Sequence, residues 1–161
     1  MRAYLQLPDI KGNITTKGYE HWIGLESVHH DFDSQARRMV SGHSGARFNG
    51  QTLFGEFEVV KAIDVSSPLI FQSFCQGTNL PTVKITLFQM GTPLKPYLEY
   101  ELSDVVISQL NRLYDGGYHH PYEIFHLSYT KIQEKFTPYN QQQKAKAPII
   151  AAYDVCAACS L

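Results

Sequence analysis

The 161-residue chain carries little charge of either sign and has no long hydrophobic run. Charged residues make up 18% of it, the formal net charge is −1, and lysine and arginine form no continuous stripe. This excludes the strongly basic surface with which many proteins bind nucleic acids or acidic membranes. No apolar run approaches the ~20 residues that a membrane-spanning helix needs. The sequence therefore predicts no nucleic-acid partner and no membrane partner.

The N-terminus lacks the uninterrupted apolar region of about 7–15 residues that a secretory signal peptide requires. Gln6, Pro8 and Asp9 interrupt it. We therefore expect a protein that is made in the cytoplasm and is exported, if at all, by a dedicated machine without a cleavable signal peptide.

Motifs of catalysis and of metal binding are also missing. The chain has no nucleophile elbow, no HExxH and no phosphate-binding loop. His29 and His30 are neighbours in a predicted strand, so their rings are expected on opposite faces. Cys156 and Cys159 have the spacing of redox and zinc motifs, but they lie at the end of a β-rich chain. We expect no enzyme, no cofactor and no metal, and interpret residues 156–161 as a C-terminal tail.

Aromatic residues and alternating apolar patterns are abundant, with ten tyrosines and nine phenylalanines. Strand patterns cover residues 3–8, 19–32, 52–63, 82–90, 97–110, 122–136 and 148–155. Changes of phase near Ile23-Gly24 and at Ser103-Asp104 indicate bulges. The spacing of these segments predicts an all-β fold, a sandwich or a barrel, in a single domain over residues 1–155.

One short helix is predicted at about residues 67–76. Ser67 has the side chain of an N-cap, Pro68 suits the first helical position, and Gly77 suits a left-handed C-cap. A helix of this length is not stable alone, so its apolar face must pack against the sheets. We expect it to cover one end of a barrel and to bury Cys75 as a small apolar side chain.

The segment 33–51 contains several glycines and no sustained period, which predicts a long loop. Loops of this length in compact domains are usually functional. Phe48, Leu53 and Phe54 are apolar residues that a monomer has little reason to expose. We hypothesise that residues 41–55 lie on a neighbouring copy of the chain, with these three side chains as inter-subunit contacts; the alternative is a mobile surface loop.

Six motifs occur in a fixed order along the chain. They are IKG at 10–12, WIGLES at 22–27, FEVVKAIDVSSPLI at 57–70, GTNLPTVKIT at 77–86, YLEYELSDVVIS at 97–108 and YTKIQEKFTP at 129–138. Together they resemble the Hcp family, the tube-forming proteins of bacterial type VI secretion systems.

The resemblance implies a two-sheet β-barrel flanked by an α-helix and a structural, secreted protein. It also implies homohexameric rings that stack into a tube, with sheath and spike proteins as partners and protein effectors in the lumen. The residues themselves leave one alternative open, a monomeric β-barrel that binds a small ligand in its interior.

Overall fold

The structure is a computed structural model that describes residues 2–34, 52–91, 93–114 and 120–160. This part of the chain is rich in strands and has one short helix, as predicted. The elements are β1 (Arg2–Gln6), β2 (Ile23–Leu25), β3 (Ser27–Ser34), β4 (Thr52–Ala62), α1 (Ser67–Gln76), β5 (Leu80–Gln89), β6 (Lys95–Leu113), β7 (Tyr122–Ser128), β8 (Lys131–Phe136), β9 (Ile149–Asp154) and β10 (Cys159–Ser160).

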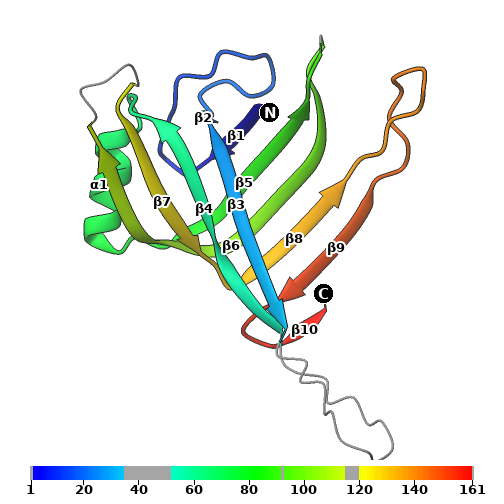
Figure 1. Ribbon diagram of the computed structural model, residues 1–161. Coiled ribbons are helices and arrows are strands. Elements are labelled where there is room, and N and C mark those ends of the chain that lie inside the picture. Colours follow the sequence, from blue (N-terminus) through cyan, green and yellow to red (C-terminus); the bar gives the residue numbers. More distant parts are fainter. Residues whose placement is uncertain (1, 35–51, 92, 115–119, 161) are drawn as a thin grey trace, which may run out of the picture.

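Strand β6 belongs to two sheets. Its first part pairs with β5 and β8, and its second part pairs with β7. The change occurs around Asp104, whose φ of 50° lies in the left-handed region. This confirms the predicted irregularity at Ser103-Asp104. Figure 1 shows the strand curving at the bottom of the molecule from one sheet to the other.

The two sheets form a barrel in a loose sense only. The first sheet has the order β10-β9-β8-β6-β5-β1-β2, and the second joins β3, β4 and β7 to β6. At the opposite corner Glu26 links β2 to β3, and its amide donates a hydrogen bond of 2.8 Å to the Val60 carbonyl. Within the described residues no strand ladder closes the circle, and β8, β9 and β10 extend the first sheet beyond the corner (Figure 1).

Two predicted strands differ from the observed ones. The segment 122–136 is not one strand but β7 and β8, which lie in different sheets and are separated at Tyr129-Thr130. The segment 19–32 begins as a loop, since Tyr19 and Trp22 pack on the outer face of the first sheet around Phe88. In both segments the apolar residues do pack against other parts of the molecule. In 122–136 they belong to strands of two different sheets, and at Tyr19 and Trp22 they belong to a loop that covers a sheet face.

Side chains fill the space between the sheets. Phe57 and Phe125 come from the second sheet, Ile85 and Leu102 from the first, and Ile70 from the helix, and all five are fully buried. A ligand inside the barrel would have to displace these groups. The alternative of an interior small-molecule site is therefore not favoured.

Helix α1 has the predicted bounds but uses its residues differently. Ser66, not Ser67, occupies the N-cap position and makes no side-chain cap bond, whereas Gly77 has the predicted left-handed C-cap with φ of 58°. Only the face with Ser67, Ile70 and Ser73 is buried. The prediction of a buried Cys75 is wrong, because it lies on the exposed side of the helix.

A buried polar cluster fastens α1 to the second sheet. Lys61 on β4 and Glu123 on β7 are fully buried and lie 2.9 Å apart, Nζ to Oε1. The Ser67 hydroxyl donates to Glu123 Oε1 at 2.7 Å and accepts from Lys61 at 3.1 Å. Arg112 Nε donates to Glu123 Oε2 at 3.0 Å, and its Nη2 donates to the Ser67 carbonyl at 2.7 Å. The Ser67 hydroxyl is therefore bonded to Glu123 and Lys61, which explains why it does not bond the free amides at the start of the helix.

Asp64 completes this cluster from the turn before the helix. Its Oδ1 lies 2.8 Å from Lys61 Nζ and accepts the Ser66 amide at 2.9 Å. Burial alone would raise the pKa of Asp64, but the bonds from Lys61 and Ser66 outweigh it and hold that pKa below its ordinary value. The cluster thus pairs two cations with two anions, which is the condition under which buried charges are tolerated.

Candidate assembly surfaces

Among the described residues, no three or more histidine, cysteine or acidic side chains gather where they could hold a metal ion. No helix in the same part of the chain is long and apolar enough to cross a membrane. The features of interest are surfaces, and they lie on the strand edges and on the outer sheet faces.

The first surface is the end of the β3–β4 hairpin, where Ser34 pairs with Thr52 and residues 35–51 connect the two strands. Phe48 lies outside the described residues. Leu53 is 44% exposed, so it is available to a partner. Phe54 instead stacks on Tyr153 of its own copy, with ring centroids 4.9 Å apart. The structure therefore does not bring Leu53 and Phe54 together as one exposed patch.

The second surface is a pair of open strand edges. β10 pairs only with Tyr153 and Asp154 of β9, so the Ile149–Ala152 part of β9 has no outer neighbour among the described strands. Ile149 and Ile150 are 68% and 55% exposed there. In the second sheet, among the described strands, β3 pairs with β4 alone. Exposed apolar edges of this kind are templates for pairing with another chain.

These edges were not predicted from the sequence. The segment 148–155 was predicted only as a strand, and it forms β9 near the rim of the first sheet. The adjacent isoleucines Ile149 and Ile150 were the available signal, because two neighbouring apolar residues in a strand point to opposite faces and only one can reach a core.

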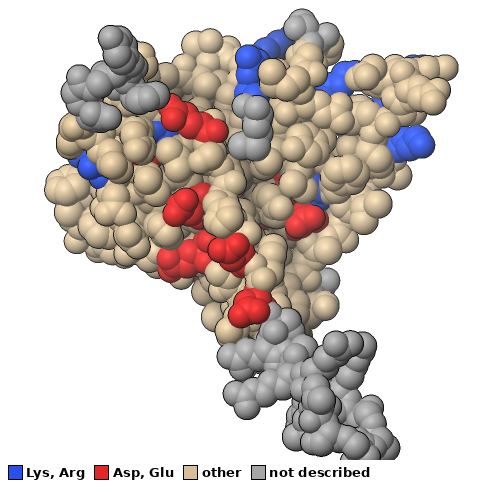
Figure 2. All heavy atoms as spheres, in the orientation of Figure 1, with Lys and Arg blue, Asp and Glu red and all other residues tan. Residues whose placement is uncertain are grey.

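The two outer sheet faces differ in charge. On the first sheet three lysines have acidic neighbours: Lys84 lies 3.3 Å from Glu101, Lys135 lies 2.7 Å from Glu99 and Lys131 lies 3.4 Å from Asp154. The second sheet instead carries Glu56 and Glu58 on one face of β4. Figure 2 shows acidic side chains gathered on this side of the molecule. The first face is therefore polar but nearly neutral, and the second is acidic.

The match to known proteins agrees with this fold. Residues 4–136, well over half of the chain, match the sequence model of the family described as "Type VI secretion system effector, Hcp". The chain belongs to the Hcp family. As an Hcp protein it is a structural component of the tube of a type VI secretion system, which confirms the resemblance of the six motifs. Compared with curated protein sequences, the chain matches none.

Solved structures share the whole architecture of this Hcp chain. One described as a type six secretion system protein superposes with a TM-score of 0.91 at 20% identity, covering 99% of each chain. Hcp1 from Salmonella typhimurium has a TM-score of 0.79 at 17% identity, covering 99% of this chain and 98% of its own. Hcp3 from Pseudomonas aeruginosa has a TM-score of 0.62 at 16% identity, covering 94% and 98%. At these identities the likeness shows the fold alone.

His30 is the titratable group inside this Hcp fold that faces the aromatic core. As predicted, His29 points outward, while the His30 ring stacks on Phe57 with centroids 3.8 Å apart. His30 Nε2 lies 2.8 Å from the Tyr129 hydroxyl, and Nδ1 is buried with no hydrogen-bond partner. Burial lowers the pKa of His30, because the charged imidazolium is poorly solvated among these rings.

We therefore expect the stability of the fold to fall as the pH falls from about 7 to about 5. The unfolded chain binds a proton at His30 near the ordinary pKa of about 6.5, whereas the folded chain binds it only at lower pH. The neutral His30 ring therefore contributes to the free energy of unfolding when the pH is above the pKa of His30 in the unfolded chain. This contribution is lost as the pH falls below that pKa. His30→Gln should flatten this slope in denaturant titrations at fixed protein concentration, and the exposed-ring control His120→Gln should keep it. An unchanged slope in His30→Gln would contradict the assignment.

Proposed function

We propose that six copies of this Hcp chain form a closed ring and that the rings stack into the inner tube of a type VI secretion system. The sheath and spike proteins of that machine are its partners, and protein effectors travel in the lumen. The chain acts as a structural carrier rather than as an enzyme. It stays in the cytoplasm until assembly and leaves with the machine.

The observation that carries this proposal is the pair of open strand edges, one in each sheet of the subunit. A ring of identical copies needs a heterologous contact, in which one patch of a copy meets a different patch of the next. The β9 edge with Ile149 and Ile150 and the β3 edge are two such patches. Pairing them head to tail would satisfy both rows of backbone groups and would cover the apolar side chains.

The outer face of the first sheet supports a carrier role. Its cross-strand pairs Lys84–Glu101 and Lys135–Glu99 present hydrogen-bonding groups with almost no net charge. A lumen that passes different effectors should bind none of them tightly, and a polar, charge-balanced wall has this property. We assign this face to the lumen.

The contact proposed for residues 41–55 can be tested with Phe48→Ala and Leu53→Ala combined. Phe54 is not used, because its stacking on Tyr153 contributes to the folded subunit itself. We expect the wild type to form six-membered rings in native mass spectrometry and electron microscopy, and the double variant to be monomeric. Large-to-small changes at an interface centre commonly cost about 2 kcal/mol or more each.

The matched control is Val65→Ala with Leu69→Ala, two exposed apolar residues, one just before α1 and one on it, away from the hairpin. This variant should retain rings. Hydrogen exchange adds a readout of the edges, because the amides of Ile149–Ala152 should be slower in rings than in the monomeric variant. A wild type that remains monomeric at all concentrations would contradict the proposed function.

A further inference from the structure

The last hairpin of the first sheet carries two cysteines that lie outside the core. Cys156 lies in the turn between β9 and β10, and Cys159 begins β10. Both thiols are free and exposed, as is that of Cys75 on α1, the third cysteine of the chain. The motif CAAC has the spacing found in pairs of cysteines that form a disulfide with each other. The shape of the turn decides whether these two thiols can react.

The turn between β9 and β10 is fixed at both of its ends. At its start the Val155 amide donates to the Thr130 carbonyl at 2.8 Å, which holds the turn on the residue just before β8. At its end Cys159 pairs with Asp154 across the hairpin. Between these points the Asp154 carboxylate accepts the Ala157 amide at 2.8 Å. This bond is the main cause that holds the pKa of Asp154 below its ordinary value, so the carboxylate stays charged and the bond persists at neutral pH.

A turn of this shape brings the two cysteines close together. Residues 155–158 alone reverse the chain between the paired residues Asp154 and Cys159. Ala158 completes the reversal in the left-handed region, with φ of 52°. The first and fourth residues of a tight turn have Cα atoms less than about 7 Å apart, and disulfides join Cα atoms that are about 4.4–6.8 Å apart. Cys156 and Cys159 are spaced in this way, so a bond between them requires little movement of the backbone.

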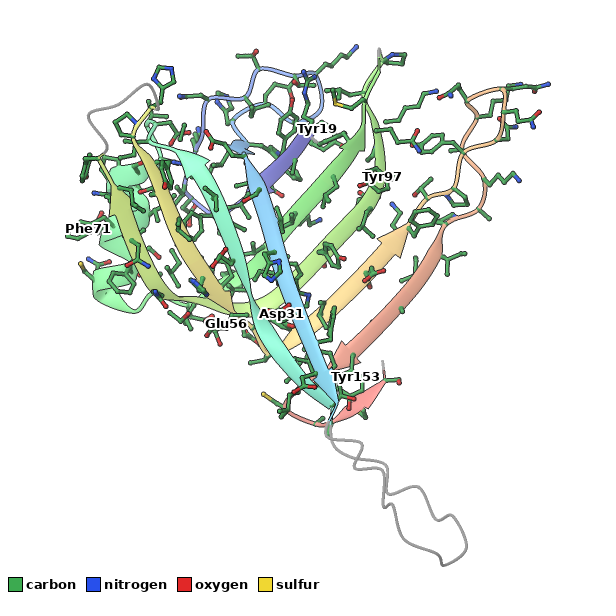
Figure 3. The ribbon with its side chains drawn as sticks, in the orientation of Figure 1. Tyr19, Asp31, Glu56, Phe71, Tyr97 and Tyr153 are labelled. Atoms are coloured by element: carbon green, nitrogen blue, oxygen red, sulfur yellow. The ribbon has the colours of Figure 1, made fainter. Side chains whose placement is uncertain are left out.

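Strand β10 has little else to hold it on the sheet. It is two residues long, and both residues are exposed. Cys159 pairs with Asp154 and Ser160 with Tyr153, and Figure 3 shows Tyr153 at the end of the sheet where β10 lies. A strand that buries so little apolar surface opens more readily than the strands of the core. A covalent link across the turn should therefore have a measurable effect on β10.

We propose that Cys156 and Cys159 are a reversible dithiol–disulfide pair that fastens β10 to β9. The pair is reduced in the cytoplasm, where thiols are kept reduced, and is oxidised by a low-molecular-weight disulfide once the chain leaves it. The site itself does not depend on the ring, and only the timing of the oxidation rests on the proposed function. Cys75 takes no part, because α1 lies well apart from β10 (Figure 1).

The oxidation consists of two thiol–disulfide exchanges, with oxidised glutathione as the oxidant. The thiolate of one cysteine attacks a sulfur of oxidised glutathione, which breaks the S–S bond and releases one glutathione thiolate. The thiolate of the other cysteine then attacks the protein sulfur of this mixed disulfide and releases the second glutathione. Two electrons pass from the chain to the oxidant, and the two protons of the protein thiols are taken up by the glutathione thiolates. The second exchange is favoured because both cysteines lie in one turn.

A titration with reduced and oxidised glutathione tests the pair in the purified full chain. After acid quenching, the free thiols are labelled with a maleimide and counted by intact mass. The wild type should change from three labelled thiols to one, without bound glutathione, before both forms of glutathione are equally abundant. After digestion, the peptide of residues 147–161 should have lost the mass of two hydrogen atoms and should be linked to no other peptide.

Serine variants separate the pair from the third cysteine. Cys75→Ser should titrate with the midpoint of the wild type and change from two labelled thiols to none. Cys156→Ser and Cys159→Ser should form only mixed disulfides with glutathione, because in each the remaining cysteine of the turn has lost its partner. All three side chains are exposed, so the variants should unfold at the same temperature as the reduced wild type.

Hydrogen exchange tests the effect on β10. The most protected amide of residues 155–160 should exchange about fivefold or more slowly in the oxidised wild type than in the reduced one, because the link suppresses local opening. Cys156→Ser should show no such difference between the two conditions. Equal exchange in the oxidised and reduced wild type would overturn the role of the bond in fastening β10.

Three results of the titration would overturn the pair itself. They are a wild type that stays reduced at equal amounts of the two forms of glutathione, a wild type that carries glutathione on Cys156 and Cys159 separately, and chains that are linked to one another. The last result would assign these thiols to contacts between copies.

Trapping in cells tests the timing of the oxidation. Chains from the cytoplasm and from the culture medium are alkylated immediately and compared by mass. The cytoplasmic chain should carry a label on every cysteine, and the exported chain should contain the Cys156–Cys159 disulfide. An exported chain that is still reduced would contradict the inference. A chain that never reaches the medium would contradict the proposed function alone, because the glutathione titration decides the inference independently.

Discussion

Glu123→Gln is expected to lower the free energy of unfolding by about 3–5 kcal/mol, the usual cost of removing one partner from a buried ion pair. Glu123 accepts bonds from Lys61 and Ser67 at one oxygen and from Arg112 at the other. A glutamine amide has the same shape but presents an NH₂ group on one side. Whichever way it is oriented, that group faces a donor, and the two cations Lys61 and Arg112 are left with Asp64 as the single anion of the cluster.

The size of this effect depends on burial. Lys61 and Glu123 are both fully buried, so water cannot replace the lost partner. A domain of ordinary stability has only about 5–15 kcal/mol in total. The variant should therefore lose a large part of its stability and, with it, the fixed position of α1 on the second sheet.

Chemical denaturation of the variant and the wild type at one protein concentration measures this difference. Glu101→Gln is the matched control, since the half-exposed Lys84–Glu101 pair lies 3.3 Å apart and water can solvate the lysine that remains. Such exposed pairs contribute about 0–1 kcal/mol. Equal small losses in the two variants would show that the buried cluster has no special role in holding the helix.

This cluster also explains the most specific part of the sequence. Three of the four polar residues of the motif KAIDVSS belong to the cluster. Lys61 and Ser67 contact the Glu123 carboxylate, and Asp64 contacts Lys61. The motif could be recognised in the sequence. Its bonding partner Glu123 could not be predicted, because it lies 62 residues after Lys61 and only the pairing of β4 with β7 brings the two together. Contacts of this kind depend on strand register, which alternation alone does not determine.

Alternation predicted where strands occur but not which sheet they join. The alternation of 122–136 shifts phase after Tyr129, and one strand was expected in spite of the shift. The chain in fact changes sheets at that point. The helix bounds were predicted well, since Pro68 and Gly77 act through local backbone preferences. The burial of Cys75 was predicted wrongly because a flanking helix buries one narrow face rather than the whole apolar side.

On the candidate surfaces, too, features set by neighbouring residues could be predicted, and features set by contacts between distant strands could not. The shared face of Glu56 and Glu58 follows from their spacing of two residues along one strand. The stacking of Phe54 on Tyr153 joins β4 to β9, which lie in different sheets, and no local pattern indicates it. The open edge of β9 likewise depends on β10 being only two residues long.

Gly12→Ala is expected to destabilise the fold by about 3 kcal/mol, at the upper end for an added methyl group, because the group would meet backbone that cannot move freely. Gly12 is buried, and its amide donates to the His21 carbonyl at 2.7 Å. A Cβ at this position would lie 2.4 Å from the Trp22 carbonyl oxygen and 2.7 Å from the Ile23 Cα. This is the physical reason for a glycine in the motif IKG.

Relief of that clash would require Trp22 and Ile23 to shift, and both have structural roles. Ile23 begins β2, pairs with Leu5 of β1 and is fully buried, while Trp22 packs on Tyr19 over the first sheet. Gly24→Ala is the control, since its Cβ would meet only the flexible end of Ile14 at 3.3 Å, and we expect a cost below about 1 kcal/mol. If thermal and chemical unfolding show equal stability for the two variants, the close approach at Gly12 does not hold the 11–22 loop on the sheet.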